Sequence, residues 1–229
     1  GISIVKRKLV TLIIHESESS TPIDWAFVPN ESYETWRFLF RHIVAHAIQP
    51  RFVVCDGQRG LLKALFEVWP HVRVQRCMIH VIRQANLWLT QRPKTPAGIE
   101  LRMLVKQLPT IRTRRQKRRW IHTFRYWRRR HNQFLKERTY SPTNPKRWWY
   151  THRKLRAVRS LLRNALPHLF TYVRYRQVPR TSNHVEGGIN SRIKDLLRIH
   201  RGLSPYRKQV LTACYLAVRQ GQKPTRNFY

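Results

Sequence analysis

The pattern of apolar and polar positions in residues 1–92 predicts strands that alternate with helices, and hence a mixed α/β fold. The apolar run from Lys8 to Ile14 is expected to form a strand buried on both faces, and Ile23 to Val28 forms a second strand that Pro29 ends. After Ser32, a typical helix N-cap, apolar residues recur at spacings of three and four. Shorter strands and helices follow at 52–55, 61–68, 72–74 and 77–89. This order predicts an α/β sheet with parallel members.

Residues 93–178 show helical spacing and loops only, after a break marked by Pro93 and Pro96. A loop is expected at 140–150 and a second basic helix at 155–165. We interpret one stripe at helical spacing as a core face; it consists of Trp120, Phe124, Trp127, His131 and Phe134. Off this stripe lie Arg114, Arg115, Arg118, Arg125 and Arg129.

Residues 179–229 are predicted to add two helices. The first runs from Asn183 to Ile199, and the second from Pro205 to Arg219. Ser204 followed by proline is typical of a helix start, because proline fits the first helical position. The pattern therefore divides the chain into three parts, 1–92, 93–178 and 179–229.

The charge of the chain indicates a polyanionic partner. The 229 residues include 46 Lys and Arg against 11 Asp and Glu, a formal net charge of +35. Hydrophobic residues make up 41% of the chain and eight are Trp, so a packed core is expected rather than a disordered basic tail. Arginines interleaved with aromatic residues favour nucleic acid over an anionic membrane, because guanidinium groups bind phosphate bidentately and stack on bases. The arginines off the aromatic stripe are therefore expected to face DNA.

Hydropathy and cysteine spacing limit the setting of the chain. No apolar run approaches the ~20 residues needed to span a bilayer, so we expect no membrane-spanning segment. Cys55, Cys77 and Cys214 are too few and too widely spaced for a disulfide framework. These features predict a reducing setting, the cytoplasm or nucleoid.

Asp56 is the first of two carboxylates that stand apart from the others, which are expected to be caps or surface ion pairs. It directly follows the apolar strand 52–55 and precedes Gly57. In open α/β sheets ligands bind outside the carboxyl ends of strands, and a carboxylate there can hold a hard divalent cation. An Asp-Gly turn, or a cap for the next helix, explains the position equally well. Both interpretations stay open.

Glu186 is the second of these carboxylates. Asn183 as N-cap and Glu186 at the third helical position would form a capping box. Gly187 and Gly188 follow, and each costs a helix about 1 kcal/mol relative to Ala, so a helix start selected for stability alone would avoid them. Bare backbone beside a carboxylate suits the close approach of a phosphodiester strand. Two carboxylates in so basic a chain indicate metal-assisted phosphodiester chemistry, which usually needs a third.

Four sequence blocks occur in a fixed order along the chain. They are Val-Cys-Asp-Gly-Gln-Arg-Gly-Leu at 54–61, Cys-Met-Ile-His at 77–80, Thr-Ser-Asn-His-Val-Glu-Gly-Gly-Ile-Asn at 181–190 and Leu-Arg-Ile-His-Arg-Gly-Leu-Ser at 197–204. Together they resemble bacterial insertion-sequence transposases of the Mutator-like group. The resemblance covers nearly the whole chain, and the block around Glu186 is its most specific part.

This resemblance implies a ribonuclease H-like domain, in which a mixed sheet with flanking helices is interrupted by an all-helical insertion. It implies an Asp-Asp-Glu triad in which Asp56 matches the second Asp and Glu186 the Glu, with two Mg²⁺ ions, or Mn²⁺, as cofactor. The implied activity is cleavage and strand transfer of an insertion sequence. The implied partners are double-stranded transposon-end and target DNA and further copies of the chain, in a homodimer or larger assembly.

The resemblance also assigns residues to DNA binding. Cys77 and His80 match the group's Cys-x-x-His signature, which we interpret as structural or as a guide for DNA, because no second pair with zinc-finger spacing exists. Trp120 and Trp127, like Trp148 and Trp149, fall in the insertion, where related transposases stack aromatic residues on DNA. The full expected set is Cys77, His80, Arg114, Arg115, Arg118, Trp120, Trp127, Asn183, Arg192 and Arg201.

The first Asp of the implied triad has no match. The resemblance places it on the strand before Lys8 to Ile14, where the chain has Gly1-Ile2-Ser3-Ile4 and no acid before Glu16. We expect these residues to be the remainder of that strand, and the chain to be an N-terminally truncated transposase that binds DNA and cleaves it poorly. Two alternatives stay open: a non-catalytic DNA- or RNA-binding protein derived from a transposase, and a structure-specific nuclease.

Overall fold

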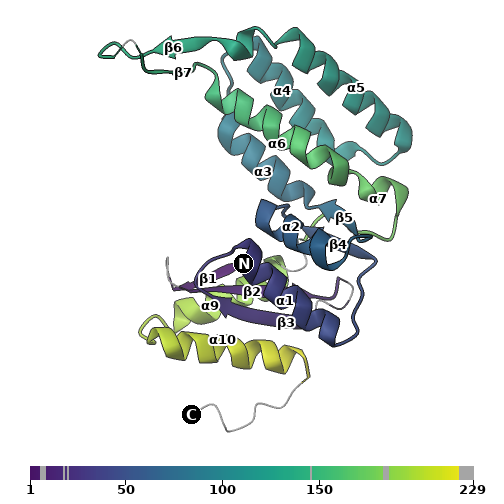
Figure 1. Ribbon diagram of the computed structural model, residues 1–229, viewed down its shortest axis with the longest axis vertical. Coiled ribbons are helices and arrows are strands. Elements are labelled where there is room, and N and C mark those ends of the chain that lie inside the picture. The colour runs from purple at the N-terminus through teal and green to yellow at the C-terminus, as the bar shows by residue number, and fades with distance from the viewer. Residues whose placement is uncertain (6–8, 18, 20, 145, 183–185, 222–229) are drawn as a thin grey trace. The chain divides into compact units, whose positions relative to one another are not determined.

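The chain folds as two compact units. The computed structural model describes residues 1–229 apart from 6–8, 18, 20, 145, 183–185 and 222–229 (Figure 1). Unit 1 contains residues 1–53, 57–73 and 182–229, and unit 2 contains residues 54–56 and 74–181. Residues 93–178, the part with helical spacing, therefore all belong to unit 2.

An antiparallel sheet of three strands opens unit 1. β1 (Ile2–Val5) pairs with β2 (Leu9–His15), and β2 pairs with β3 (Pro22–Val28), in the order β1-β2-β3. The strands predicted from the apolar runs at 8–14 and 23–28 are confirmed. Ile2 lies opposite Thr11, so the expectation that the first residues form part of a strand is confirmed as well.

The C-terminal helices of unit 1 pack on its first strand. They are a π-helical turn, η3 (Glu186–Asn190), followed by α9 (Ser191–Ile199) and α10 (Pro205–Arg219). Ile189, Ile193 and Leu216 are at most 1% exposed and form one apolar cluster with Ile2 and Ile4. Fully burying one such aliphatic side chain contributes about 1.5–3 kcal/mol, so this cluster is a main source of stability in unit 1.

Two further helices of unit 1 follow the sheet. α1 (Tyr33–Ala45) begins at Ser32, whose hydroxyl and the side chain of Thr35 form a reciprocal capping box, as expected for this N-cap. α2 (Arg59–Val68) contacts α1. The ring of Phe40 stacks on that of Trp36 within α1 at 5.5 Å, and it lies 5.2 Å from the tilted ring of Trp69, the residue after α2, so aromatic contacts join the two helices.

β4 (Phe52–Cys55) and β5 (Arg73–Arg76) form a two-stranded sheet, and the division between the units falls within both strands. The Arg73 amide donates to the Arg51 carbonyl at 3.1 Å, and the Cys77 amide to the Cys55 carbonyl at 2.6 Å. From the first bond to the second, both the acceptor and the donor move four residues toward the C-terminus. The two strands therefore run parallel, as predicted. The strands in the described residues form three small sheets, which confirms the mixed α/β class; the ribonuclease H-like arrangement stays a prediction.

Helices form most of unit 2. They are α3 (Met78–Leu89), α4 (Pro96–Gln107), α5 (Arg114–Arg130), α6 (Arg153–Leu169) and α7 (Thr171–Arg174), with 3-10 turns at Leu108–Thr110 and Phe134–Lys136. The predicted core face of α5 is confirmed, because Trp120, Phe124 and Trp127 are buried in one cluster with residues of the neighbouring helices. None of the helices that the structure describes is long and apolar enough to cross a membrane.

A β-hairpin replaces the loop expected at 140–150. β6 (Arg138–Tyr140) pairs with β7 (Trp148–Tyr150), and Thr139 lies opposite Trp149 (Figure 1). The expectation of helices and loops alone is therefore wrong here. Strands of three residues show too little alternation to be recognised, and this hairpin is supported by cations above its aromatic rings. Arg138 lies 4.0 Å from the Trp148 ring and Arg156 of α6 lies 3.4 Å from the Tyr150 ring.

The cluster around β1 predicts a large effect of one substitution in α9. Ile193→Ala removes a side chain that is 1% exposed, and we expect it to lower the free energy of unfolding by about 2–5 kcal/mol. Ile199→Ala in the same helix removes a side chain that is 70% exposed, and its effect should stay within about 0.5 kcal/mol. Urea unfolding followed by tryptophan fluorescence and circular dichroism measures both; equal effects would contradict the assigned packing.

Candidate active site and nucleic-acid surface

Asp56 lies at the carboxyl end of β4, beside the end of β5. Its carbonyl accepts a hydrogen bond from Nε of Arg76 at 3.0 Å, while the preceding Cys55 carbonyl accepts from the Cys77 amide. The chain then turns at Gly57, whose φ of 79° lies in the left-handed region that glycine adopts most readily. Asp56 is thus half-buried at the edge where ligands bind in parallel sheets. That it holds a metal ion stays a prediction.

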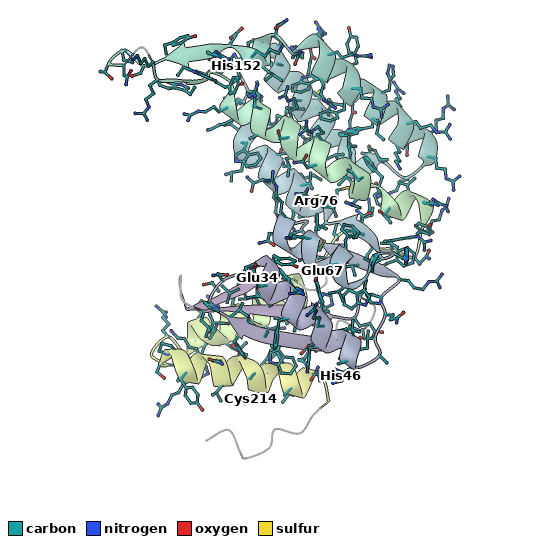
Figure 2. The ribbon with its side chains drawn as sticks, viewed as in Figure 1. Glu34, His46, Glu67, Arg76, His152 and Cys214 are labelled. Atoms are coloured by element: carbon teal, nitrogen blue, oxygen red, sulfur yellow. The ribbon has the colours of Figure 1, made fainter. Side chains whose placement is uncertain are left out.

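Arg76 is a site residue that the sequence analysis missed. It is half-buried at the end of β5 (Figure 2), and its Nε–H···O bond fixes the backbone of Asp56. Burial lowers the pKa of the Arg76 guanidinium, whereas Cys55 and Asp56 act in the opposite direction. A cation beside the candidate metal ligand is therefore held by the same strand pair. The sequence feature that could have identified Arg76 is its place at the end of a short strand, Arg73-Val-Gln-Arg, whose other residues alternate between polar and apolar.

A buried polar network anchors β5 to the helices of unit 2. The Gln75 side chain is fully buried; its amide group donates to the carbonyls of Leu169 and Arg76, and its oxygen accepts from the Tyr172 amide. The Tyr172 hydroxyl donates to the Ile111 carbonyl at 2.8 Å, and burial raises the pKa of Tyr172 to about 12. Because its groups are satisfied, this network rigidifies the strand that positions Arg76.

The segment that leads to Glu186 starts close to these strand ends. The Arg180 carbonyl accepts from the Met78 amide at 3.0 Å, and its guanidinium donates to the Pro109 carbonyl at 3.1 Å. Met78 follows Cys77, which is bonded to Cys55 of β4. Arg180 is therefore tied to the strand pair that carries Asp56.

Glu186 begins the π-helical turn that precedes α9, a type of turn that is frequent at functional sites. Asn183 lies outside the described residues, as does the side chain of Glu186, so the expected capping box is not tested. Asp56 and Glu186 belong to different units, each described by itself. Their meeting at one metal site stays a prediction.

The two glycines after Glu186 have open space around them. A Cβ added to Gly187 or Gly188 would meet no atom within 4 Å, and neither residue has a positive φ. The fold of the chain therefore does not require glycine at either position. Gly187 is exposed and Gly188 is half-buried, and open space beside both agrees with the expectation that another molecule approaches here.

The expected DNA-binding residues divide by exposure. Arg114, Arg115 and Arg118 are exposed on α5, Arg192 is exposed on α9, and Arg201 is exposed in the turn after α9. His80 is half-buried in the first turn of α3. The exposed cations can reach a phosphate backbone directly, although Arg192 and Arg201 belong to unit 1 and the α5 arginines to unit 2.

For three residues of the expected DNA-binding set, the structure supports the other role that the sequence left open: a core face for Trp120 and Trp127, and a structural role for Cys77. Trp120 and Trp127 are 3% and 2% exposed, and their indole N–H groups donate to the carbonyls of Leu104 and Ala97 at 2.8 and 3.0 Å. Cys77 is fully buried at the start of α3. These side chains pack inside the protein, so they cannot stack on or touch DNA in this fold. Trp148, by contrast, is 40% exposed on the β6–β7 hairpin.

Most remaining acids form the surface pairs expected of them. Glu67 pairs with Arg37, Glu100 with Arg130 and His131, Glu137 with His152, and Asp195 with Arg198. In the described part of the chain, no three His, Cys, Asp or Glu side chains form a group that could hold a metal ion. The oxygen donors of Asp56 and Glu186 suit a hard cation such as Mg²⁺, but of the two only the Asp56 side chain is described.

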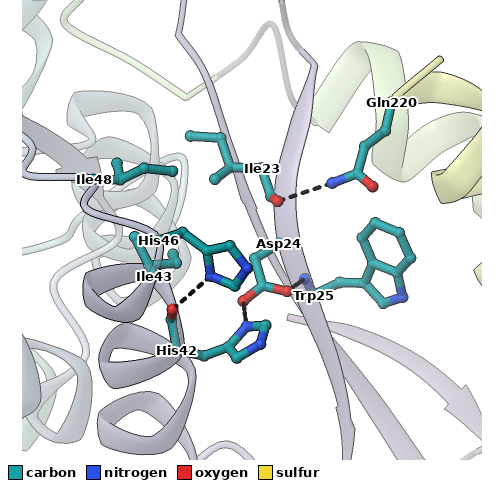
Figure 3. Close-up of a pocket in the computed structure, with 8 residues that line it drawn as sticks. All are labelled: Ile23, Asp24, Trp25, His42, Ile43, His46, Ile48 and Gln220. Carbon is teal, nitrogen blue, oxygen red and sulfur yellow. Dashed lines mark hydrogen bonds and ion pairs between the residues drawn. The ribbon is translucent and has the colours of Figure 1, made fainter. Parts of the chain in front are cut away.

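A pocket of about 250 Å³ in unit 1 contains acid–base groups that the sequence analysis did not select (Figure 3). Asp24 of β3 accepts from the Trp25 amide at 2.8 Å and lies 2.7 Å from Nδ1 of His42 on α1. His46 bonds to the His42 carbonyl, one turn away. These contacts hold α1 on the sheet, and the pair agrees with the ion-pair interpretation of Asp24.

A comparison with known families decides the assignment of the chain. The model of the family described as "Transposase, Mutator family" matches residues 22–141, just over half of the chain. The chain belongs to the Mutator family of transposases. The matched stretch includes Asp56 and ends before Glu186.

Two curated relatives of this Mutator-family chain are insertion-sequence transposases. A probable transposase for an insertion sequence element of Corynebacterium diphtheriae is 29% identical over 147 residues, which are 59% of this chain and 42% of the relative. The transposase for insertion sequence element IS1201 of Lactobacillus helveticus is 34% identical over 62 residues, which are 27% of this chain and 17% of the relative. The chain thus matches less than half the length of either relative.

The open space at the glycines predicts that alanine stabilises the fold. Gly187→Ala and Gly188→Ala should each raise the free energy of unfolding by about 0.4–1 kcal/mol, because alanine restricts the unfolded chain and meets no clash here. Gly202→Ala, also in open space but outside the helical turns, is the control for a general effect of alanine. Chemical denaturation measures all three. Destabilisation by the first two alone would show that the π-helical turn itself requires glycine.

Proposed function

We propose that this chain carries catalytic residues of an insertion-sequence transposase, which cleaves DNA and transfers the strand in a metal-dependent reaction. The observation that carries the proposal is the place of Asp56, at the shared carboxyl end of two parallel strands in a Mutator-family chain. Both relatives are named as insertion-sequence transposases, which agrees with this activity. Double-stranded DNA and other copies of the chain are its proposed partners.

The place of Glu186 in the chain supports the second half of the site. Ile189 and Ile193, one turn and two turns beyond it, pack on Ile2 and Ile4 of β1. The resemblance places the first Asp of the triad on this same strand. On the N-terminal side of Glu186 along the chain, the Arg180 carbonyl accepts a hydrogen bond from the Met78 amide. Six residues of fully extended chain span at most about 20 Å, so the covalent chain alone keeps Glu186 within that distance of Arg180.

The proposed roles follow from these positions. Asp56 and Glu186 would hold the metal, which would supply activation of the attacking oxygen and stabilisation of the leaving oxygen of the phosphodiester. Arg76 fixes the backbone of Asp56, and bare backbone at 187–188 lets a nucleic-acid strand come close. The exposed arginines of α5 hold the DNA backbone by charge-assisted hydrogen bonds.

Removing the two carboxylates tests the catalytic proposal. Asp56→Ala and Glu186→Ala should each lower Mg²⁺- or Mn²⁺-dependent DNA nicking at least about 100-fold, because each removes a metal ligand. DNA affinity should stay the same or increase, because one negative charge near the phosphates is lost. Asp195→Ala, which removes an exposed carboxylate of α9, is the matched control.

The nicking assay should use both the printed chain and the chain together with any residues that its gene encodes before Gly1, because the resemblance expects the first Asp there. Nicking by either form that survives both substitutions contradicts the proposal. DNA binding without nicking by either form favours a non-catalytic binding protein. Nicking without strand transfer favours a structure-specific nuclease.

DNA binding by this chain should depend steeply on salt. With six to ten phosphates contacted, the affinity for a DNA duplex should fall by about 10³–10⁵ between 50 and 200 mM salt, because condensed counterions are released on binding. Fluorescence anisotropy with a labelled duplex measures the slope in the absence of divalent metal. An affinity that hardly changes over this range would contradict a phosphate-dominated interface.

A further inference from the structure

Unit 2 contains a hollow lined almost entirely by arginine. It measures about 460 Å³, and its lining residues are Arg125, Arg128, Arg129, Asn132 and Arg159. Pockets of roughly 300–1,000 Å³ are typical of small-molecule sites. The hollow therefore has room for more than a bare ion.

The local structure directs these side chains to one place. Arg125, Arg128 and Arg129 share one face of α5, because residues three and four apart are neighbours on a helix. Arg128 lies 6.0 Å from the ring of Phe124, and the Asn132 amide bonds to the Arg129 carbonyl where α5 ends. Arg159 comes from α6 and is half-buried. Two helices and the residue after α5 thus supply one set of donors.

Nothing acidic in the described structure neutralises this set. α5 and α6 contain no Asp or Glu, and Glu100 and Glu137 of unit 2 pair with Arg130, His131 and His152. Across the described residues, no ion pair joins a lining guanidinium to a carboxylate. Burial and the neighbouring cations Arg156, Arg128 and Arg163 lower the pKa of Arg159. Several like charges are therefore held together without a protein counterion.

Helix stability explains only part of this arrangement. Cations in the last turn of a helix interact favourably with its dipole, which accounts for Arg128 and Arg129 at the end of α5. It accounts neither for Arg125, one turn earlier, nor for Arg159 on α6. Neighbouring phosphates of a polyanion would offset positive charge on both helices.

We propose that the hollow lined by Arg125, Arg128, Arg129 and Arg159 binds neighbouring backbone phosphates of double-stranded DNA. Planar guanidinium groups bind phosphate oxygens bidentately, and the side-chain NH₂ group of Asn132 adds a neutral donor. The proposal rests on the proposed function in that it takes DNA as the ligand, but it requires neither Asp56 nor a metal ion. It assigns a phosphate clamp to the C-terminal half of α5 together with α6.

The test compares two pairs of exposed arginines in unit 2. Arg125→Gln with Arg129→Gln removes two lining charges, and Arg92→Gln with Arg176→Gln removes two charges elsewhere. Duplex binding is measured by anisotropy in EDTA, between 50 and 200 mM salt. The plot of log affinity against log salt should lose about two units of slope in the first variant, and less than one unit in the second. Arg159→Lys, which keeps the charge but loses the planar fork, should weaken binding with little change in slope.

Each outcome separates this inference from the proposed function. If the unmodified chain binds no DNA, the proposed function fails first. If it binds DNA and both double variants lose the same slope, the clamp is overturned. If the first variant loses binding only to vesicles of anionic lipid, the hollow serves lipid headgroups and the proposal is wrong. Circular dichroism verifies folding, and because Arg125 and Arg129 are exposed, their replacement should not disturb the core.

Discussion

The burial of Ile189, Ile193 and Leu216 against β1 is the interaction on which the candidate site depends. It joins the beginning of the described chain to its last two helices, so that residues separated by most of the sequence share one core. The hydrophobic effect is not directional. Because Ile189 belongs to the turn that Glu186 begins, its burial nevertheless fixes the position of that turn on the sheet. A carboxylate can act in phosphodiester chemistry only if its backbone is held in place, and this cluster holds it.

In unit 2 the corresponding constraint is polar. Gln75 is fully buried, and its side-chain amide forms three hydrogen bonds with backbone groups. A buried polar group does not destabilise the fold when it is hydrogen-bonded in this way. The same strand ends at Arg76, which bonds to the carbonyl of Asp56. The two candidate carboxylates are therefore positioned by different physics: an apolar cluster for Glu186 and a hydrogen-bonded strand pair for Asp56.

Local pattern predicted the elements well, and non-local contacts explain what it missed. Helical spacing was enough to place Phe124 in the core, because a stripe of large side chains has no other stable location. The same stripe left two roles open for Trp120 and Trp127, and only burial with bonded indole groups decides against DNA. The β6–β7 hairpin and Arg76 were missed because their partners, Arg156 and the Asp56 carbonyl, come from other segments.

The scarcity of acids links the stability of the protein to its ligand. With a formal charge of +35, and with Glu100 and Glu137 of unit 2 engaged in local pairs, repulsion among arginines opposes compaction. Any polyanion that binds the folded state better than the unfolded chain stabilises the fold by mass action. DNA would then have two effects, because it is both the proposed substrate and a source of negative charge for the arginines that have no carboxylate partner in the described residues. If the surface binds phosphate as proposed, the same charges make the free protein less stable. This cost should be largest at half-buried Arg159, which has no carboxylate partner among the residues that the structure describes.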